Sequence, residues 1–237
     1  MSAVYFLTLR QLTGRWRLLV MTALALMPVV ISVLMVSNPD APTVGSFEQA
    51  VLSVMLFGSI APLIVLALAA PAFANEIEDR TIANLTLSPM SRTAIVAAKL
   101  LAVISIAAPF IGASAFATGY AAFLGDVKAT LAITVSALAG VVLYASAFQW
   151  LGLVTTQAIG VGLAYIVLWE GFFAGFVSGA RILSISHHSI ALMHGIDPRR
   201  FDMWPHVNFV VALVVAVAFV AVFNWLSVGR LRRMDVP

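Results

Sequence analysis

Long apolar runs alternate with short polar segments along the whole chain. A helix needs about 20 mostly apolar residues to cross the hydrocarbon core of a bilayer. Six runs reach that length, and none shows the apolar–polar alternation of a membrane β-barrel strand. The predicted spans are residues 18–36, 51–74, 100–124, 131–154, 158–178 and 207–228. We therefore predict an all-α membrane protein in which residues 1–237 form one transmembrane domain.

Residues 4–17, before the first span, mix aromatic and aliphatic side chains with three arginines. This composition suits a helix that lies in the membrane interface with its cations toward lipid phosphates. A simple extension of the first span fits the same residues, so both interpretations stay open.

The segment between the fifth and sixth spans, residues 179–206, is also not a plain loop. It is apolar from residue 182 to residue 196. Short re-entrant helices are tolerated at membrane depth where protein buries them. We therefore expect a re-entrant segment between spans five and six.

The composition agrees with a membrane protein and excludes several functional classes. The chain is 62% hydrophobic and 10% charged, with a mean hydropathy of +1.05, whereas soluble domains carry about a quarter charged residues. It has no cysteine, which excludes disulfides, thiolate metal sites and iron–sulfur clusters. A single membrane domain of this length leaves no room for a soluble catalytic domain.

The positive charges predict the orientation, because cytoplasmic loops are enriched in Lys and Arg. With six spans and a cytoplasmic N-terminus, nine basic residues fall inside and four outside. The inside group is Arg10, Arg15, Arg17, Arg80, Arg92, Lys99, Arg230, Arg232 and Arg233; the outside group is Lys128, Arg181, Arg199 and Arg200. We predict that both termini are cytoplasmic.

The cytoplasmic segment between spans two and three is the most informative part of the sequence. Thr81 is placed to cap a short helix, in which Ile82 and Leu85 share one face. Ser88 precedes a proline, which disfavours helix and ends the element, and Ser91 can cap the next helix. A short amphipathic helix under the membrane suits docking into a groove on a soluble partner. A solvated loop that only fixes topology fits equally well on physical grounds.

The same segment resembles the type-2 ABC transporter permease family. In that family acidic residues precede a Gly-Thr pair, two apolar residues, a Pro-Ile-Ser-Arg-like turn and a lysine that opens the third span. Here Arg80 stands where many members have Gly, and Met90 replaces a common Ile or Val. By resemblance, the coupling residues that contact an ATP-binding subunit are Glu76, Glu78, Asp79, Arg80, Thr81, Ile82, Leu85, Ser88, Pro89 and Arg92.

The resemblance implies a function and a set of partners. It implies a permease subunit of an ABC exporter in the plasma membrane of a prokaryote, paired with an identical or different second permease. ATP and Mg²⁺ would be bound by a separate ATP-binding subunit, because this chain has no Walker A sequence. The chain itself is then not an enzyme and has no catalytic residue or cofactor of its own. The alternatives are a stand-alone secondary transporter, though these tend to be longer and internally repeated, or an intramembrane enzyme.

Glu170 is the one acidic residue deep in a predicted span, where a carboxylate requires a protein partner or water. It could line a transport pathway or make a structural hydrogen bond. Gly171, Gly175 and Gly179 follow at four-residue spacing, which allows close helix packing at a subunit interface or within the chain. Neither choice is fixed by the sequence.

The external segment concentrates histidine and serine, which raises two further hypotheses. Adjacent histidines on a helix point about 100° apart, so His187 and His188 are poorly placed to chelate together. No repeated metal-ligand spacing involves His194 or His206 either. We therefore expect histidines of a loop helix and no metal site. The neighbouring serines prompt the enzyme alternative, but no Gly-x-Ser-x-Gly sequence is present.

Overall fold

The fold is described from a computed structural model of the chain. It covers residues 2–37, 43–78, 90–173, 184–201 and 208–234, and every regular element within them is a helix. This part of the chain confirms the predicted all-α architecture.

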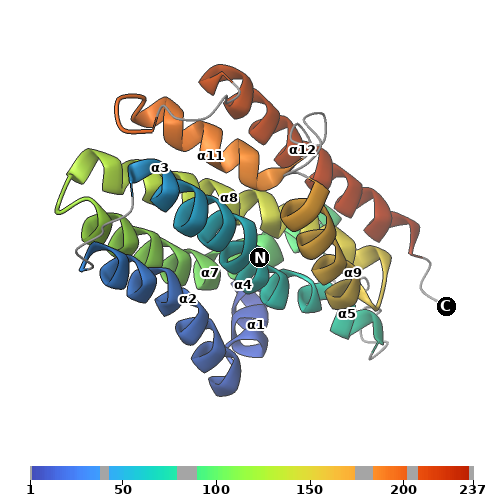
Figure 1. Cartoon of the computed structure of the whole chain (residues 1–237). Coiled ribbons are helices and arrows are strands. Elements are labelled where there is room, and N and C mark those ends of the chain that lie inside the picture. Colours follow the sequence, from blue (N-terminus) through green and yellow to red (C-terminus); the bar gives the residue numbers. More distant parts are fainter. Residues whose placement is uncertain (1, 38–42, 79–89, 174–183, 202–207, 235–237) are drawn as a thin grey trace.

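The helices pack side by side, as Figure 1 shows. In chain order they are α1 (Ser2–Leu12), α2 (Arg15–Val36), α3 (Val44–Phe47), η1 (Glu48–Ile60), α4 (Ala61–Ala69), α5 (Pro71–Glu78), α7 (Arg92–Ala122), α8 (Val127–Val154), α9 (Ala158–Ala164), η2 (Tyr165–Phe173), α11 (Ile185–Ile196) and α12 (Phe209–Arg233). The two η elements are π-helical, with a wider winding than an α-helix. Such windings are rare in proteins as a whole, and those that occur are often at functional sites.

Five helical stretches of the described chain are long and apolar enough to cross a membrane. They are Arg15–Val36, Val44–Glu78, Arg92–Ala122, Val127–Val154 and Phe209–Arg233. Each contains most or all of a predicted span. The predicted fifth span, residues 158–178, appears as a shorter apolar helix over Ala158–Phe172, and its predicted end lies outside the described residues.

Two helices extend about two turns before the apolar runs that were predicted as spans. The second span was predicted to begin at residue 51, but the helix begins at Val44, where Thr43 accepts a hydrogen bond from the Ser46 amide at 3.3 Å. The third span was predicted to begin at residue 100 within a helix capped by Ser91, and α7 begins at Arg92, directly after that cap. Each of these added turns contains polar residues, so the apolar run is shorter than the helix.

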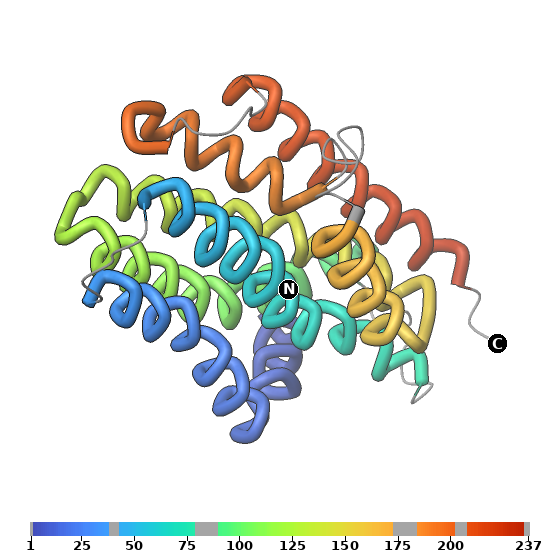
Figure 2. Tube along the Cα trace, in the orientation of Figure 1, coloured from blue at the N-terminus to red at the C-terminus, as the bar shows by residue number. Residues whose placement is uncertain are grey.

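Helix α8 forms the centre of the bundle. It packs against α7, α4, α5, α11 and α12, and Figure 2 shows its course among them. The backbone of Gly152 in α8 approaches Ala70 so closely that an added Cβ would lie 2.3 Å from the Ala70 carbonyl oxygen. Only glycine fits at this crossing, where the last turn of α8 lies against the junction of α4 and α5.

The periphery of the bundle is apolar and uncovered. Helix α12 exposes Val210, Val214, Val217 and Trp225 by half or more of their surface, and α2 exposes a similar set. Apolar surface this extensive on a helix of spanning length is expected to face lipid. The pattern of exposure therefore supports a membrane protein independently of sequence length.

The N-terminal residues form a helix of their own. Helix α1 ends at Leu12, Thr13 and Gly14 are not helical, and α2 starts at Arg15 in a different direction (Figure 1). Helix α1 packs against α7, where the Tyr5 hydroxyl lies 3.0 Å from the Ser105 hydroxyl. The interpretation of residues 4–17 as an extension of the first span was therefore wrong.

Candidate functional site

The segment predicted to couple to a partner is bounded by a buried ion pair. Glu76 lies in the last turn of α5, and Lys99 lies in the second turn of α7. The Lys99 Nζ is 2.6 Å from a Glu76 carboxylate oxygen, and Lys99 has no exposed surface. The pair joins the two helices on either side of residues 79–89.

The surroundings of Lys99 complete its coordination. Its ammonium also donates to the carbonyl of Ala72 and lies 4.4 Å from the centroid of the Phe73 ring. A carboxylate, a carbonyl and an aromatic face together replace the water that a cation loses on burial. Glu76 was expected at a docking surface, but it is buried and faces the interior.

The start of α7 is fixed by a cap, as predicted. The Ser91 hydroxyl accepts a hydrogen bond from the amide of Ala94 at 3.2 Å. Glu78, the last described residue of α5, is exposed, and Arg92 is half-buried. The other expected coupling residues lie outside the described part of the chain: Asp79, Arg80, Thr81, Ile82, Leu85, Ser88 and Pro89.

The end of α12 meets the same end of the bundle. Leu231 packs with Phe73, Ile95 and Leu153 in a small apolar cluster, which we call the loop-end cluster. The Arg230 guanidinium Nε lies 3.5 Å from the Leu153 carbonyl oxygen. The last turn of α12 is thus packed beside the ion pair and both helices that flank residues 79–89.

Glu170 is buried and bonded by four donors. Its carboxylate accepts hydrogen bonds from Tyr165 at 2.8 Å, from the hydroxyls of Ser184 and Ser186 at 2.5 and 2.6 Å, and from the Ile185 amide at 2.9 Å. These donors, apart from Tyr165, form the first turn of α11, where a negative charge is favoured by the helix dipole. The contacts favour the structural interpretation of Glu170.

Gly171, the first glycine after Glu170, makes no close helix packing within the described chain. Gly171 is exposed, and an added Cβ would contact only the carbonyl oxygen of Ile166 in the same helix, at 3.6 Å. The interpretation as packing within the chain is thus not supported at this residue. Gly175 and Gly179 lie outside the described residues.

Helix α11 lies in the segment that was predicted to be re-entrant, and it is held at its other end too. His194, in its last turn, contacts the carboxylate of Glu48 in η1 through Nε2, and both side chains are almost completely buried. His194 also stacks on Phe201. Sequence reasoning missed Glu48; a signal was available, since an acidic residue stands three positions before the predicted second span.

Three serines of this segment make hydrogen bonds that hold α11 in place. Ser184 and Ser186 donate to Glu170, and Ser189 donates to the Ile185 carbonyl at 3.1 Å. Among the described residues no three His, Asp or Glu side chains are grouped to hold a metal ion. These contacts do not support a serine–histidine catalytic pair.

A comparison with protein families decides the assignment. The sequence profile of the ABC-2 family transporter proteins matches residues 6–185, more than half of the chain. The chain belongs to this ABC-2 transporter family. As a member, it is a multi-pass membrane protein and a permease component of an ABC transporter, which is a transport subunit. A search of curated proteins found no match.

Proposed function

We propose that the chain is the membrane-spanning permease subunit of an ABC exporter. It has six spans, with both termini in the cytoplasm of a prokaryotic cell, and pairs with a second permease subunit. ATP and Mg²⁺ are bound by a separate ATP-binding subunit that docks on residues 78–92. Family membership over residues 6–185 supports the general class.

The observation that carries the proposal is the Glu76–Lys99 pair beside the loop-end cluster. It fixes the helices on either side of residues 79–89 to each other and sets them next to the end of α12. A partner that moves this segment then acts on the spanning helices α5 and α7 together. The exposed carboxylate of Glu78, beside this segment, is free to face a soluble partner.

The proposal is tested by purifying the chain from its native membrane in mild detergent and measuring ATP hydrolysis. The expected partner has a Walker A sequence and hydrolyses Mg·ATP. Replacing Leu85 by Ala should lower complex formation and coupled ATP turnover about tenfold, because a docking helix concentrates its binding energy in a few apolar side chains. Glu78→Ala should chiefly slow association.

A matched control is Leu131→Ala, which truncates an exposed leucine on α8 away from the loop end. It should leave ATP turnover unchanged. Undiminished turnover in both Leu85→Ala and Glu78→Ala would return residues 79–89 to the role of a solvated connection.

A further inference from the structure

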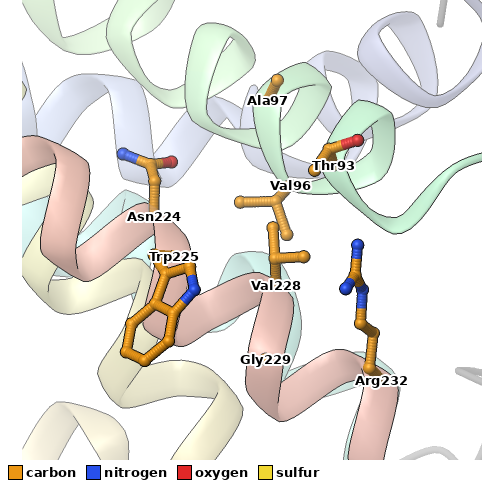
Figure 3. Close-up of a pocket in the computed structure, with 8 residues that line it drawn as sticks. All are labelled: Thr93, Val96, Ala97, Asn224, Trp225, Val228, Gly229 and Arg232. Carbon is orange, nitrogen blue, oxygen red and sulfur yellow. The ribbon is translucent and has the colours of Figure 1, made fainter.

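A groove opens between the beginning of α7 and the end of α12, with a volume of about 380 Å³ (Figure 3). This volume is within the range of about 300–1,000 Å³ that small-molecule sites occupy. Residues from both helices line it: Thr93, Val96, Ala97, Asn224, Trp225, Val228, Gly229 and Arg232. None of these residues takes part in the ion pair or the Glu170 network.

The two ends of the groove differ in chemistry. Arg232 points from α12 toward the first turn of α7, near Thr93, and Val96 and Val228 face each other in the middle (Figure 3). Trp225 lies toward the other end, with 74% of its surface exposed. Arg232 lies seven positions after Trp225, so the groove runs roughly 10 Å along α12. It is cationic at one end, and at the other end the Trp225 ring lies beside the amide of Asn224.

The position of the groove selects an amphiphile from the bilayer. Trp225 and Val228 belong to the apolar helix α12, which is long enough to cross the membrane, and both fall in the predicted sixth span, so we expect their end of the groove to face the hydrocarbon. Arg230, Arg232 and Arg233 form the last turn of that helix, where arginine meets lipid phosphates. A soluble protein or a free anion would contact only the Arg232 end of the groove and would leave the part beside Trp225 and Val228 unoccupied.

The charges select an anionic headgroup. Helix α12 contains no acidic residue, and none of the ion pairs within the described chain involves Arg232. A guanidinium can bind a phosphate through two parallel hydrogen bonds. Basic pockets between spanning helices bind acidic lipid headgroups on this principle.

We propose that this groove binds one anionic phospholipid of the surrounding leaflet. Its phosphate lies on Arg232, beside the Thr93 hydroxyl, and one acyl chain lies along Val228 and Ala97 against Trp225. The lipid occupies the space between α7 and α12 next to the loop-end cluster. The proposal is independent of the ATP-coupled function, since it requires neither nucleotide nor a partner subunit.

Native mass spectrometry of the detergent-purified chain, titrated with phosphatidylglycerol or phosphatidylcholine, tests the site. The wild-type chain should retain one phosphatidylglycerol in preference to phosphatidylcholine. Arg232→Gln should lower that preference roughly fivefold. Arg233→Gln is the matched control, because Arg233 is in the same turn but does not line the groove; it should change the preference much less.

A second pair of variants tests the acyl-chain part. An added Cβ at Gly229 meets no atom within 4 Å, so Gly229→Phe can fill the groove without a backbone clash and should abolish the retained lipid. Gly160→Phe, at another open position on α9, should leave retention unchanged. Excess inorganic phosphate should not displace the lipid if the acyl chain contributes to binding.

Three results would overturn the proposal: equal effects of Arg232→Gln and Arg233→Gln, lipid retained in Gly229→Phe, or displacement by phosphate alone. If Arg232→Gln and Gly229→Phe lose the ATP-binding subunit but retain the lipid, the groove is a protein-docking surface. That result also rejects the lipid site. If a variant does not fold, Trp225-dependent fluorescence quenching, measured against Trp225→Phe, should be stronger with brominated phosphatidylglycerol than with brominated phosphatidylcholine, and equal quenching by the two lipids would reject the site. No Trp225-dependent quenching would reject the site.

Discussion

Lys99 places a cation where no part of the side chain reaches the surface, and each neighbour compensates for part of the lost hydration. Glu76 supplies the opposite charge, Ala72 a carbonyl and Phe73 the face of a ring. Burying such a pair often gives little net stability, whereas removing one member leaves an unpaired charge in the interior. The pair is therefore expected to matter most when only half of it is lost.

Glu76→Gln should destabilise the fold by about 3–5 kcal/mol, because Lys99 would remain buried without its counter-charge. The double variant Glu76→Leu with Lys99→Met should recover most of that loss, since it replaces both charges by apolar groups. Thermal unfolding in detergent micelles measures both. Equal destabilisation in the single and double variants would show that the ion pair is not the cause.

The sequence identified both members of this pair, but not the contact between them. Lys99 was recognised at the opening of a span and Glu76 within the coupling segment, and both assignments came from local context. They are 23 positions apart, and their meeting depends on how α5 and α7 pack. The same limit applies to Glu48 and His194, which lie 146 residues apart.

At the scale of elements, α11 is held at both ends by carboxylates from the two π-helical segments. Glu170 of η2 accepts hydrogen bonds from its first turn, and Glu48 of η1 contacts His194 in its last turn. Nine of the twelve residues of α11 are buried. The helix is thus part of the packed bundle, and a short helix buried by protein is what the apolar run of residues 182–196 led us to expect in this segment.

Glu170→Gln and Glu170→Leu separate the two roles of this carboxylate. The Gln variant should transport and assemble nearly as the wild type, because it keeps the shape and can still accept hydrogen bonds. The Leu variant should lose about 1–3 kcal/mol of stability, because the Ile185 amide and two serine hydroxyls would be stranded. Transport in vesicles and thermal unfolding measure the two effects. Impaired transport in a stable Gln variant would instead identify Glu170 as a pathway residue.

At the scale of the whole molecule, the hydrophobic pattern predicted the bundle well, because lipid-facing helices need long apolar runs whatever their neighbours are. It was less informative for the segment between spans five and six. There a helix of 12 residues is buried by protein, so length alone does not distinguish it from an apolar loop. Burial against α8 and α12 decides its structure, and that depends on the complete fold.

The nine-to-four distribution of basic residues predicts that both termini lie in the cytoplasm. Reporters fused after Pro237 and inserted after Pro198 should therefore report opposite sides of the membrane. An insertion at Gly125, in the turn between α7 and α8, should agree with the one at Pro198. Fusions at Pro237 and Pro198 on the same side would contradict the six-span arrangement.

The contact between Glu76 and Lys99 also has a mechanical consequence. Two helix ends joined only by a connecting segment can separate, and a displacement of the segment is then absorbed as the ends spread. Here the ion pair, the Ala72 carbonyl and the Phe73 ring fasten the end of α5 to the second turn of α7. The ends of α5 and α7 therefore move as one rigid unit beside residues 79–89, and a force on the end of either helix tilts both helices.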